Sequence, residues 1–319
     1  MANIKFGRLS NYKGYDYYGS LDYNNIPTGF GIMGNKYTNE VKTSFDFDNG
    51  KLNHFSMVRD ASNYSHIGFY NNDVIHGPYM SFIPCDLKFG LANRGTPIKN
   101  VIHIFSKSSF MISIYENGLS TNKAIVYKDG VLSFDLFKYG TNSKKTIIEK
   151  NLNFNNTYPI ANMQLKPYKY KDYYTYSDKD RIYVRQGDRT YDTSGYGFIL
   201  WLDDNSCCIS EFYDNDRTGF GCYHFPNDNY YCGQFAYNKV SGFGFYLKSD
   251  IYETSFGMFN SDKKKNGLVF TYSDTKLYIR NYYNDAVIGD SIEIDLATHN
   301  VTYYPSNGGA RLHEISKCL

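Results

Sequence analysis

The chain has 319 residues, with 34 basic and 32 acidic side chains and a net charge of +2, so its charge does not favour nucleic acid as a partner. Aromatic residues make up 18% of the sequence, with 34 Tyr and 23 Phe. Because Tyr and Phe favour strands and the good helix formers Glu and Ala are scarce, the composition predicts an all-β fold.

The sequence also lacks several signals of location and chemistry. Residues 1–20 hold no apolar run like a signal-peptide core, and no stretch approaches 18 consecutive apolar residues, so we expect a cytoplasmic protein. The six cysteines form no CxxC pair, and the seven histidines lack metal-ligand spacing. No P-loop, GxSxG or HExxH motif occurs, so we expect no catalytic residues, no metal and no cofactor.

A short phrase, Gly–aromatic–Gly after an aromatic residue and a polar turn, first occurs at residues 29–31. It returns near residue 77 and most clearly at 195–197, 219–221 and 242–244. With the first Gly as anchor, the chain gives twelve anchors spaced by 22 to 25 residues: Gly29, Asn53, Gly77, Asn100, Lys123, Thr146, Lys171, Gly195, Gly219, Gly242, Gly267 and Gly289. A fixed period of this length indicates a repeat array.

Each repeat has the pattern of a β-hairpin. An aromatic residue precedes most anchors, and turn-forming residues separate the two, as in residues 213–217 and 260–265. Most anchors are Gly or Asn, which adopt positive φ most easily. A single hairpin cannot bury its apolar face, so neighbouring hairpins are expected to stack.

The phrase weakens between residues 100 and 171, where Asn, Lys or Thr replaces the first Gly, but the period persists. We therefore predict a continuous array. Its N-terminal part spans residues 1–150 and diverges after about residue 90, and its C-terminal part spans 151–292, with the best matches at 195–270. Residues 293–319 lose the phrase and are expected to form a C-terminal cap, with a turn or two of helix at 310–317.

The segment Tyr231-Cys232-Gly233-Gln234-Phe235, followed by Gly242-Phe243-Gly244, resembles the MORN repeat, and residues 18–31 and 68–79 are similar to it. The resemblance implies an elongated all-β solenoid, here of about twelve stacked MORN-like β-hairpins. It also implies a non-catalytic scaffold or adaptor that binds a partner protein along an aromatic groove. Contact with anionic phospholipids and self-association into homo-oligomers are further expectations that the resemblance implies.

The rings of the repeated phrases are the candidate partner-binding residues, because stacked repeats would align them as a ladder. We expect that ladder to be formed by Phe30, Tyr79, Tyr196, Phe220 and Phe243. The competing interpretation is that these rings are the core of the array. The glycines of the phrases are candidate structural residues, required by positive φ or close backbone approach: Gly29, Gly31, Gly195, Gly197, Gly219, Gly221, Gly242 and Gly244.

Other interpretations stay open. Lys263, Lys264 and Lys265 form either a solvated hairpin tip or a contact for anionic lipid. A carbohydrate-binding hairpin solenoid shares the period and the aromatic content, but Trp201 is the single tryptophan. Cys208 and Cys232 are 24 residues apart and should be equivalent on adjacent hairpins, with Cys222 across a strand. These thiols have either a redox or metal role or simply pack as small apolar groups.

Overall fold

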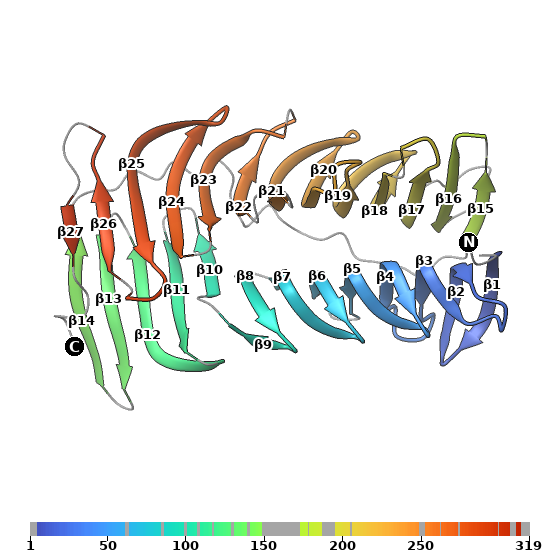
Figure 1. The fold of residues 1–319 in the computed structure, drawn as a ribbon, viewed down its shortest axis with the longest axis horizontal. Coiled ribbons are helices and arrows are strands. Elements are labelled where there is room, and N and C mark those ends of the chain that lie inside the picture. The colour runs from blue at the N-terminus through green and yellow to red at the C-terminus, as the bar shows by residue number, and fades with distance from the viewer. Residues whose placement is uncertain are drawn as a thin grey trace. The chain divides into compact units, whose positions relative to one another are not determined.

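The structure is a computed structural model that describes residues 5–60, 64–83, 86–98, 101–106, 109–116, 118–128, 131–138, 141–148, 173–177, 179–186, 195–204, 206–248, 253–261, 263–273, 275–298, 300–306 and 311–313. All elements in these ranges are β-strands, so the all-β prediction is confirmed. They form two open antiparallel sheets of successive hairpins, one with strands up to Ile148 and one with strands from Tyr173 onward (Figure 1). Within these ranges no helix has the length and apolar character needed to cross a membrane.

The chain divides into two compact units, and each combines a run of early strands with a run of late strands. Unit 1 comprises Met1–Ile83 and Leu165–Lys239, and unit 2 comprises Pro84–Gln164 and Val240–Leu319. This division differs from a sequential split into an N-terminal part at 1–150 and a C-terminal part at 151–292. The period along the chain predicts which hairpins are neighbours in sequence, but not which early hairpins pack with which late ones.

In unit 1 the strands pair antiparallel with their neighbours in sequence within each run. Their bounds are β1 Lys5–Tyr12, β2 Tyr15–Leu21, β3 Pro27–Gly34, β4 Val41–Asp48, β5 Lys51–Arg59, β6 Ser65–Asn71, β7 Val74–Ile83, β15 Tyr173–Ser177, β16 Arg181–Gln186, β17 Gly195–Trp201, β18 Cys207–Tyr213, β19 Asp216–His224 and β20 Tyr230–Ala236. Aromatic rings join the two runs in the core: the Phe30 and Phe198 ring centroids lie 6.2 Å apart, and those of Phe55 and Tyr230 lie 4.7 Å apart.

Unit 2 has the same construction. Its strands are β8 Asp86–Asn93, β9 Thr96–Pro97, β10 Val101–Ser106, β11 Ser109–Glu116, β12 Leu119–Lys128, β13 Val131–Lys138, β14 Thr141–Ile148, β21 Lys239–Lys248, β22 Glu253–Phe259, β23 Lys265–Tyr272, β24 Lys276–Tyr283, β25 Ala286–Asp295, β26 Val301–Tyr304 and β27 Arg311–His313. Its core is also aromatic, with the ring centroids of Phe89 and Phe256 4.7 Å apart and stacked. Residues 311–313 form a strand, so the helix expected at 310–317 is wrong for these three residues.

The polar turns explain how successive hairpins are held together. Asp73 lies in a two-residue turn with positive φ, and its backbone N–H donates to Leu52 O while its Oδ1 accepts from Leu52 N at 2.8 Å. Asn238 makes the same two bonds with Arg217, and Asp285 makes them with Lys265. Asn and Asp suit these positions because they tolerate positive φ and carry an acceptor. Each such turn therefore continues the hydrogen bonding of the preceding hairpin.

The glycine anchors of the described residues share a positive φ: Gly29, Gly77, Gly195, Gly219, Gly242, Gly267 and Gly289. Gly219 shows the local reason. A β-bulge places Gly219 and Phe220 between the pairs Glu211–Thr218 and Ser210–Gly221, and such bulges favour glycine at positive φ. At the second glycine of this phrase the need is for space, because a Cβ on Gly221 would lie 2.5 Å from Ile209 O.

Replacing Gly242 with Val is expected to destabilise unit 2 by about 1–3 kcal/mol, because Val strongly disfavours positive φ. Gly242 is buried in β21 with a φ of 111°. Chemical denaturation followed by circular dichroism measures the loss. Ser241→Val on the same strand, where φ is not positive, is the matched control. A loss below about 0.5 kcal/mol for Gly242→Val would show that the glycine is incidental there.

Candidate functional site

Three of the five aromatic residues expected to bind a partner are buried. Tyr196, Phe220 and Phe243 are 1%, 3% and 1% exposed, while Phe30 and Tyr79 are half-buried. Phe30 lies against the rings of Phe45 and Phe198 inside unit 1. An exposed ladder across these rings is therefore not present, and their burial agrees with the competing interpretation that they are core. The register of the phrase predicts that the rings occupy equivalent positions in successive repeats. It does not predict whether they lie on the buried or the exposed face of the sheet.

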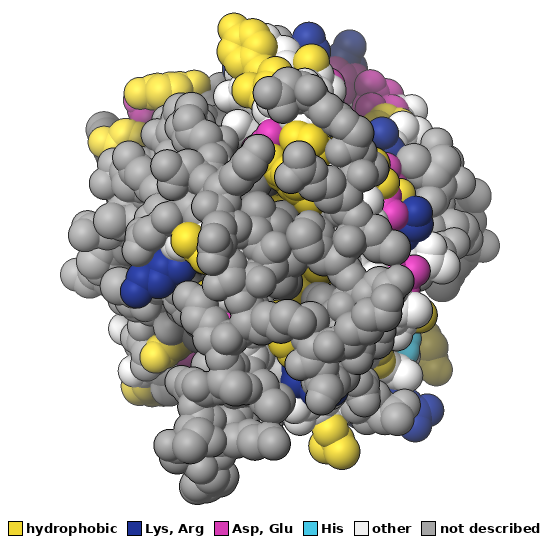
Figure 2. Space-filling model, turned by 90° about the vertical axis from the view of Figure 1, so that its left-hand side faces the viewer, with side chains coloured by type: hydrophobic (Ala, Val, Ile, Leu, Met, Phe, Trp, Pro, Cys, Tyr) yellow, Lys and Arg dark blue, Asp and Glu magenta, His cyan; other side chains and the backbone are white. Residues whose placement is uncertain are grey.

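The exposed hydrophobic side chains that the structure describes do not form such a ladder either. Tyr23, Tyr37 and Tyr237 are each more than 80% exposed and lie in separate turns. On the face drawn in Figure 2, the described hydrophobic side chains form separate groups and not one continuous patch. Isolated exposed apolar residues are normal on protein surfaces. The remaining indications of a binding site are therefore hollows of the surface and the polar groups that line them.

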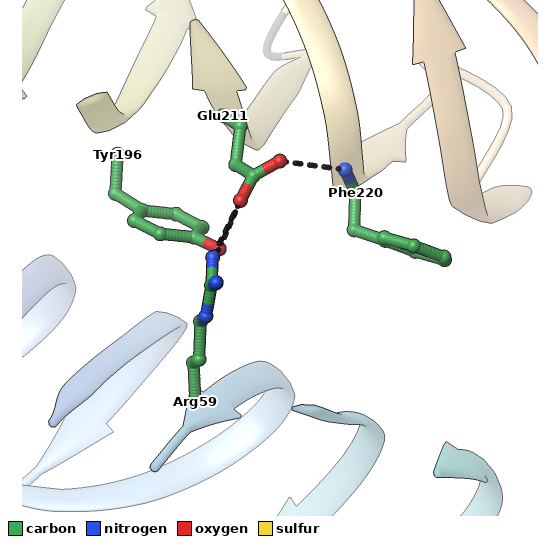
Figure 3. Close-up of polar contacts among 4 residues, drawn as sticks. All are labelled: Arg59, Tyr196, Glu211 and Phe220. Carbon is green, nitrogen blue, oxygen red and sulfur yellow. Dashed lines mark hydrogen bonds and ion pairs between the residues drawn. The ribbon is translucent and has the colours of Figure 1, made fainter. Parts of the chain in front are cut away.

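A buried polar cluster lies in the core of unit 1 (Figure 3). Arg59 at the end of β5 is 1% exposed, and its Nη1 donates to Tyr196 Oη at 2.6 Å and to Glu211 Oε1 at 2.7 Å. The Tyr196 hydroxyl also donates to Glu211 Oε1. The bulge in β19 directs the Phe220 backbone N–H to Glu211 Oε2 at 3.3 Å, and a Cβ on Gly219 would overlap that carboxylate. The glycine of the phrase thus makes room for the cluster.

Burial is the main influence on the charges of this cluster. It raises the pKa of Glu211, against the opposing effect of the Arg59 guanidinium. It also raises the pKa of Tyr196 well above its usual value, and the Glu211 charge adds to that rise. Tyr196 therefore stays protonated and acts as a donor. With Arg59 inaccessible and the carboxylate already bonded, the cluster is suited to joining β5 with β17 and β18, and not to acting on a substrate.

The cysteines are arranged differently from the expectation based on the period. Cys222 and Cys232 are paired across β19 and β20 and form a disulfide, whereas Cys208 packs with Ile199 and Phe212. Cys208 is a free thiol, and burial raises its pKa to about 11. Cys85 and Cys318 lie outside the described residues. Cys208 is therefore a packed apolar group, while the expected strand-to-strand pairing holds for Cys222 with Cys232.

Cys207, His224 and Asp228 form a chain with the order of a nucleophile, a base and an orienting carboxylate. Cys207 Sγ lies 3.9 Å from His224 Nδ1, and His224 Nε2 lies 3.2 Å from Asp228 Oδ1. Cys207 is, however, 1% exposed, and burial raises the pKa of its thiol. A protonated, buried thiol is not a nucleophile. In the described part of the chain no three His, Cys, Asp or Glu side chains are placed to hold a metal ion.

An open groove on the early strands of unit 1 is the strongest candidate for a binding site. It has a volume of about 510 Å³ and is lined by residues of β3 to β7: Thr28, Asp46, Phe47, Asp48, Asn53, His54, Phe69, Tyr70, Asn71 and His76. Register shifts fall beside it, between Gly29 and Gly31, Ser44 and Asp46, and Gly68 and Tyr70. Bulges bend strands and re-aim side chains, so they account for a hollow in the sheet.

The groove combines rings, carboxylates and amides. Phe69 is half-buried, with its ring centroid 6.5 Å from that of His54 and 4.2 Å from that of Phe55. Asp46 is partly buried and accepts a hydrogen bond from the Gly29 N–H, while Asp48 is exposed. The side chains therefore offer both a flat apolar surface and hydrogen-bond acceptors.

The sequence does not reveal this groove. His54 and His76 are two of seven histidines without metal-ligand spacing, and they are 22 residues apart. The available signal is that His54 directly follows the anchor Asn53 and His76 directly precedes the anchor Gly77, so both lie beside anchors of neighbouring hairpins. The bulges that turn them toward one hollow are not evident from the residue types, and the positive φ of 53° at His54 is uncommon for a residue other than glycine.

Comparison with known proteins gives little further information. No protein-family model matches the chain, and no curated protein matches it. Among solved structures, the wild-type TCP10 domain of Danio rerio CPAP, in complex with a peptide of Danio rerio STIL, is similar over 90% of this chain and 94% of that one. The sequence identity is 8% and the TM-score is 0.23, which is too low to support an argument about fold or binding.

Proposed function

We propose that this protein is a non-catalytic scaffold or adaptor that binds a segment of a partner polypeptide in the groove of β3–β7. The groove is the observation that carries the proposal, because it is open and presents rings, carboxylates and amides together. A polypeptide segment offers matching apolar side chains, backbone carbonyls and N–H groups. Strands position such a surface more rigidly than loops do. The resemblance to MORN repeats supports the same class of function.

The alternatives considered from the sequence have less support. The groove is lined by two carboxylates and by no Lys or Arg, so an anionic phospholipid headgroup would meet like charge there. Lys265, one of the three lysines considered for lipid contact, is paired with Glu253 at 3.1 Å. Trp201 packs near Cys208 and does not line the groove, so a tryptophan platform for carbohydrate is not offered there. Self-association stays a separate proposal.

The cytoplasmic location also stays a proposal. Disulfides form and persist mainly in oxidising compartments, so the Cys222–Cys232 bond weighs against it. Mass spectrometry of the protein purified from its host after thiol blocking would decide the oxidation state of these two cysteines. A fully reduced pair would agree with the cytoplasm.

Selection of peptides from a random display library on the full chain tests the proposed function. His76→Trp places a large ring in the groove from an exposed position, and we expect it to weaken binding of the selected peptides at least tenfold. Lys239→Trp adds the same ring at an exposed position outside the groove, at the first residue of β21, and should leave binding unchanged. Both variants should keep the thermal midpoint of the wild type.

Two results would contradict the proposal. In one, the selected peptides bind His76→Trp and wild type equally, which would place the binding surface elsewhere. In the other, the library yields no binder while glycan arrays or anionic vesicles bind the full chain and lose that binding with His76→Trp. The groove would then belong to a carbohydrate- or phospholipid-binding module.

A further inference from the structure

The lining of the groove of β3–β7 includes two carboxylates and no Lys or Arg side chain. Asp46 and Asp48 are alternate residues of β4 in regular pairing with β5, so both carboxylates project from the same face of the strand. Lys51 pairs with Asp48 across the β4–β5 turn, but no ion pair of the described residues joins Asp46 or Asp48 to a Lys or Arg side chain. A cationic group of a ligand would therefore find two acceptors close together.

The surroundings of Asp46 disfavour its ionised form. Burial raises the pKa of Asp46 and the Asp48 charge raises it further, while His54 and the Gly29 N–H act in the opposite direction. A positive charge placed between the two carboxylates would favour their ionised forms. Ionisation of Asp46 and binding of a cation therefore stabilise each other.

A second observation in the groove indicates what else the ligand carries. Asn53 Oδ1 accepts from the Asn72 N–H at 2.9 Å, which fixes the orientation of the amide. Its Nδ2 is buried and has no hydrogen-bond partner. A buried donor without an acceptor costs free energy. Because Asn53 lines the groove, a small movement of its side chain would expose Nδ2 to a carbonyl oxygen of an occupant, and that bond would be favoured. A polypeptide backbone has such an oxygen beside every side chain.

The ring of Phe69 distinguishes between the two basic side chains. It is packed against Phe55 and Tyr230 and is half-buried, and it forms part of the groove wall. A guanidinium group is planar, stacks on aromatic faces and binds carboxylates through two parallel hydrogen bonds. An ammonium group lacks the planar geometry. Arginine therefore matches the groove better than lysine.

We propose that the groove recognises an arginine side chain of the partner polypeptide, held by the carboxylates of Asp46 and Asp48 and stacked on Phe69. A backbone carbonyl of the same segment serves as the acceptor for Asn53. This inference rests on the proposed function, because it names the residue of the partner that the groove selects.

The inference is tested with peptides selected on the full chain. Each peptide is resynthesised with its Arg residues replaced one at a time by citrulline, the neutral analogue of arginine, or by Lys. Fluorescence anisotropy measures their affinities. We expect citrulline to weaken binding at least tenfold and Lys to weaken it less. The variant Asp46→Asn with Asp48→Asn should bind the arginine peptide as weakly as wild type binds the citrulline peptide. Equal binding of the arginine and citrulline peptides by wild type, or unchanged binding by the double variant, would overturn the inference.

A charge exchange keeps the test decisive where the double variant does not fold. Asp48 is exposed, so Asp48→Lys should fold, reject the arginine peptide and bind the peptide in which Glu replaces Arg. Competition by Ca²⁺ alone in a metal-free buffer would overturn the inference in favour of a metal site. Peptides that lose binding with His76→Trp but contain no essential Arg would refute the arginine proposal and leave the proposed function standing. Peptides that bind His76→Trp as tightly as they bind the wild type would refute the proposed function itself.

Discussion

Replacing Arg59 with Met is expected to destabilise unit 1 by about 3–5 kcal/mol, because it leaves the Glu211 carboxylate mostly buried without its cation. Arg59 is 1% exposed and bonds both Tyr196 and Glu211, whereas Met fills much of the same space without charge. Trp201 is the single tryptophan and packs in unit 1, so its fluorescence during chemical denaturation reports the stability of this unit.

The double variant Arg59→Met with Glu211→Gln separates the charge from the packing. It removes both ionised groups, so no buried charge is left unpaired, and it should recover a large part of the stability lost in Arg59→Met. The stability losses of Arg59→Met alone and Glu211→Gln alone are also measured. If these two losses add up to the loss of the double variant, the ion pair is not the source of the effect. The lost packing of the Arg59 side chain would then explain the result.

The pH dependence gives an independent check on Glu211. Since burial raises the pKa of Glu211 in the folded state, its protonation stabilises the fold. That contribution is fully present below the usual pKa of a glutamate, about 4.3, and is lost as the pH rises through the raised value. The stability of the wild type relative to Glu211→Gln should therefore decrease as the pH rises from about 4 toward neutrality. A difference that does not vary with pH would contradict the assigned shift.

The local elements could be predicted from the sequence because short-range chemistry specifies them. The turns placed at residues 213–217 and 260–265 coincide with the turns between β18 and β19 and between β22 and β23. Both contain Asn and Asp, which tolerate positive φ and cap the backbone. The glycine anchors with positive φ fall in strands, and at Gly219 the reason is a bulge. The resemblance to MORN repeats stays a prediction, as does the solenoid.

Long-range packing could not be predicted in the same way. The bonds of Arg59 to Tyr196 and Glu211 span 137 and 152 residues, and a period of about 24 residues does not specify them. The groove depends on three bulges, and the residue types beside them do not show which side chains will be re-aimed. Whether the rings of the repeated phrases are buried or exposed could not be predicted for a related reason. Each strand has two faces, and both carry aromatic residues.

Replacing Phe243 with Ala is expected to destabilise unit 2 by about 3–5 kcal/mol, because the ring is 1% exposed and its removal leaves a cavity. Phe243 lies 6.5 Å from Phe256, which itself stacks on Phe89. Hydrogen exchange measured by mass spectrometry on peptides of β21 and β22 reports the loss in this unit, where no tryptophan is present.

Tyr283→Ala is the matched control, because it truncates an aromatic ring of unit 2 that is 64% exposed and should change exchange in β21 and β22 very little. The comparison decides between the two interpretations of the repeated rings. If Phe243→Ala destabilises unit 2 and Tyr283→Ala does not, the ring is part of the core. The opposite result is that Phe243→Ala leaves hydrogen exchange unchanged and abolishes binding of the selected peptides. That result would show that the ring contacts the partner, and it would support the partner-binding ladder expected from the sequence.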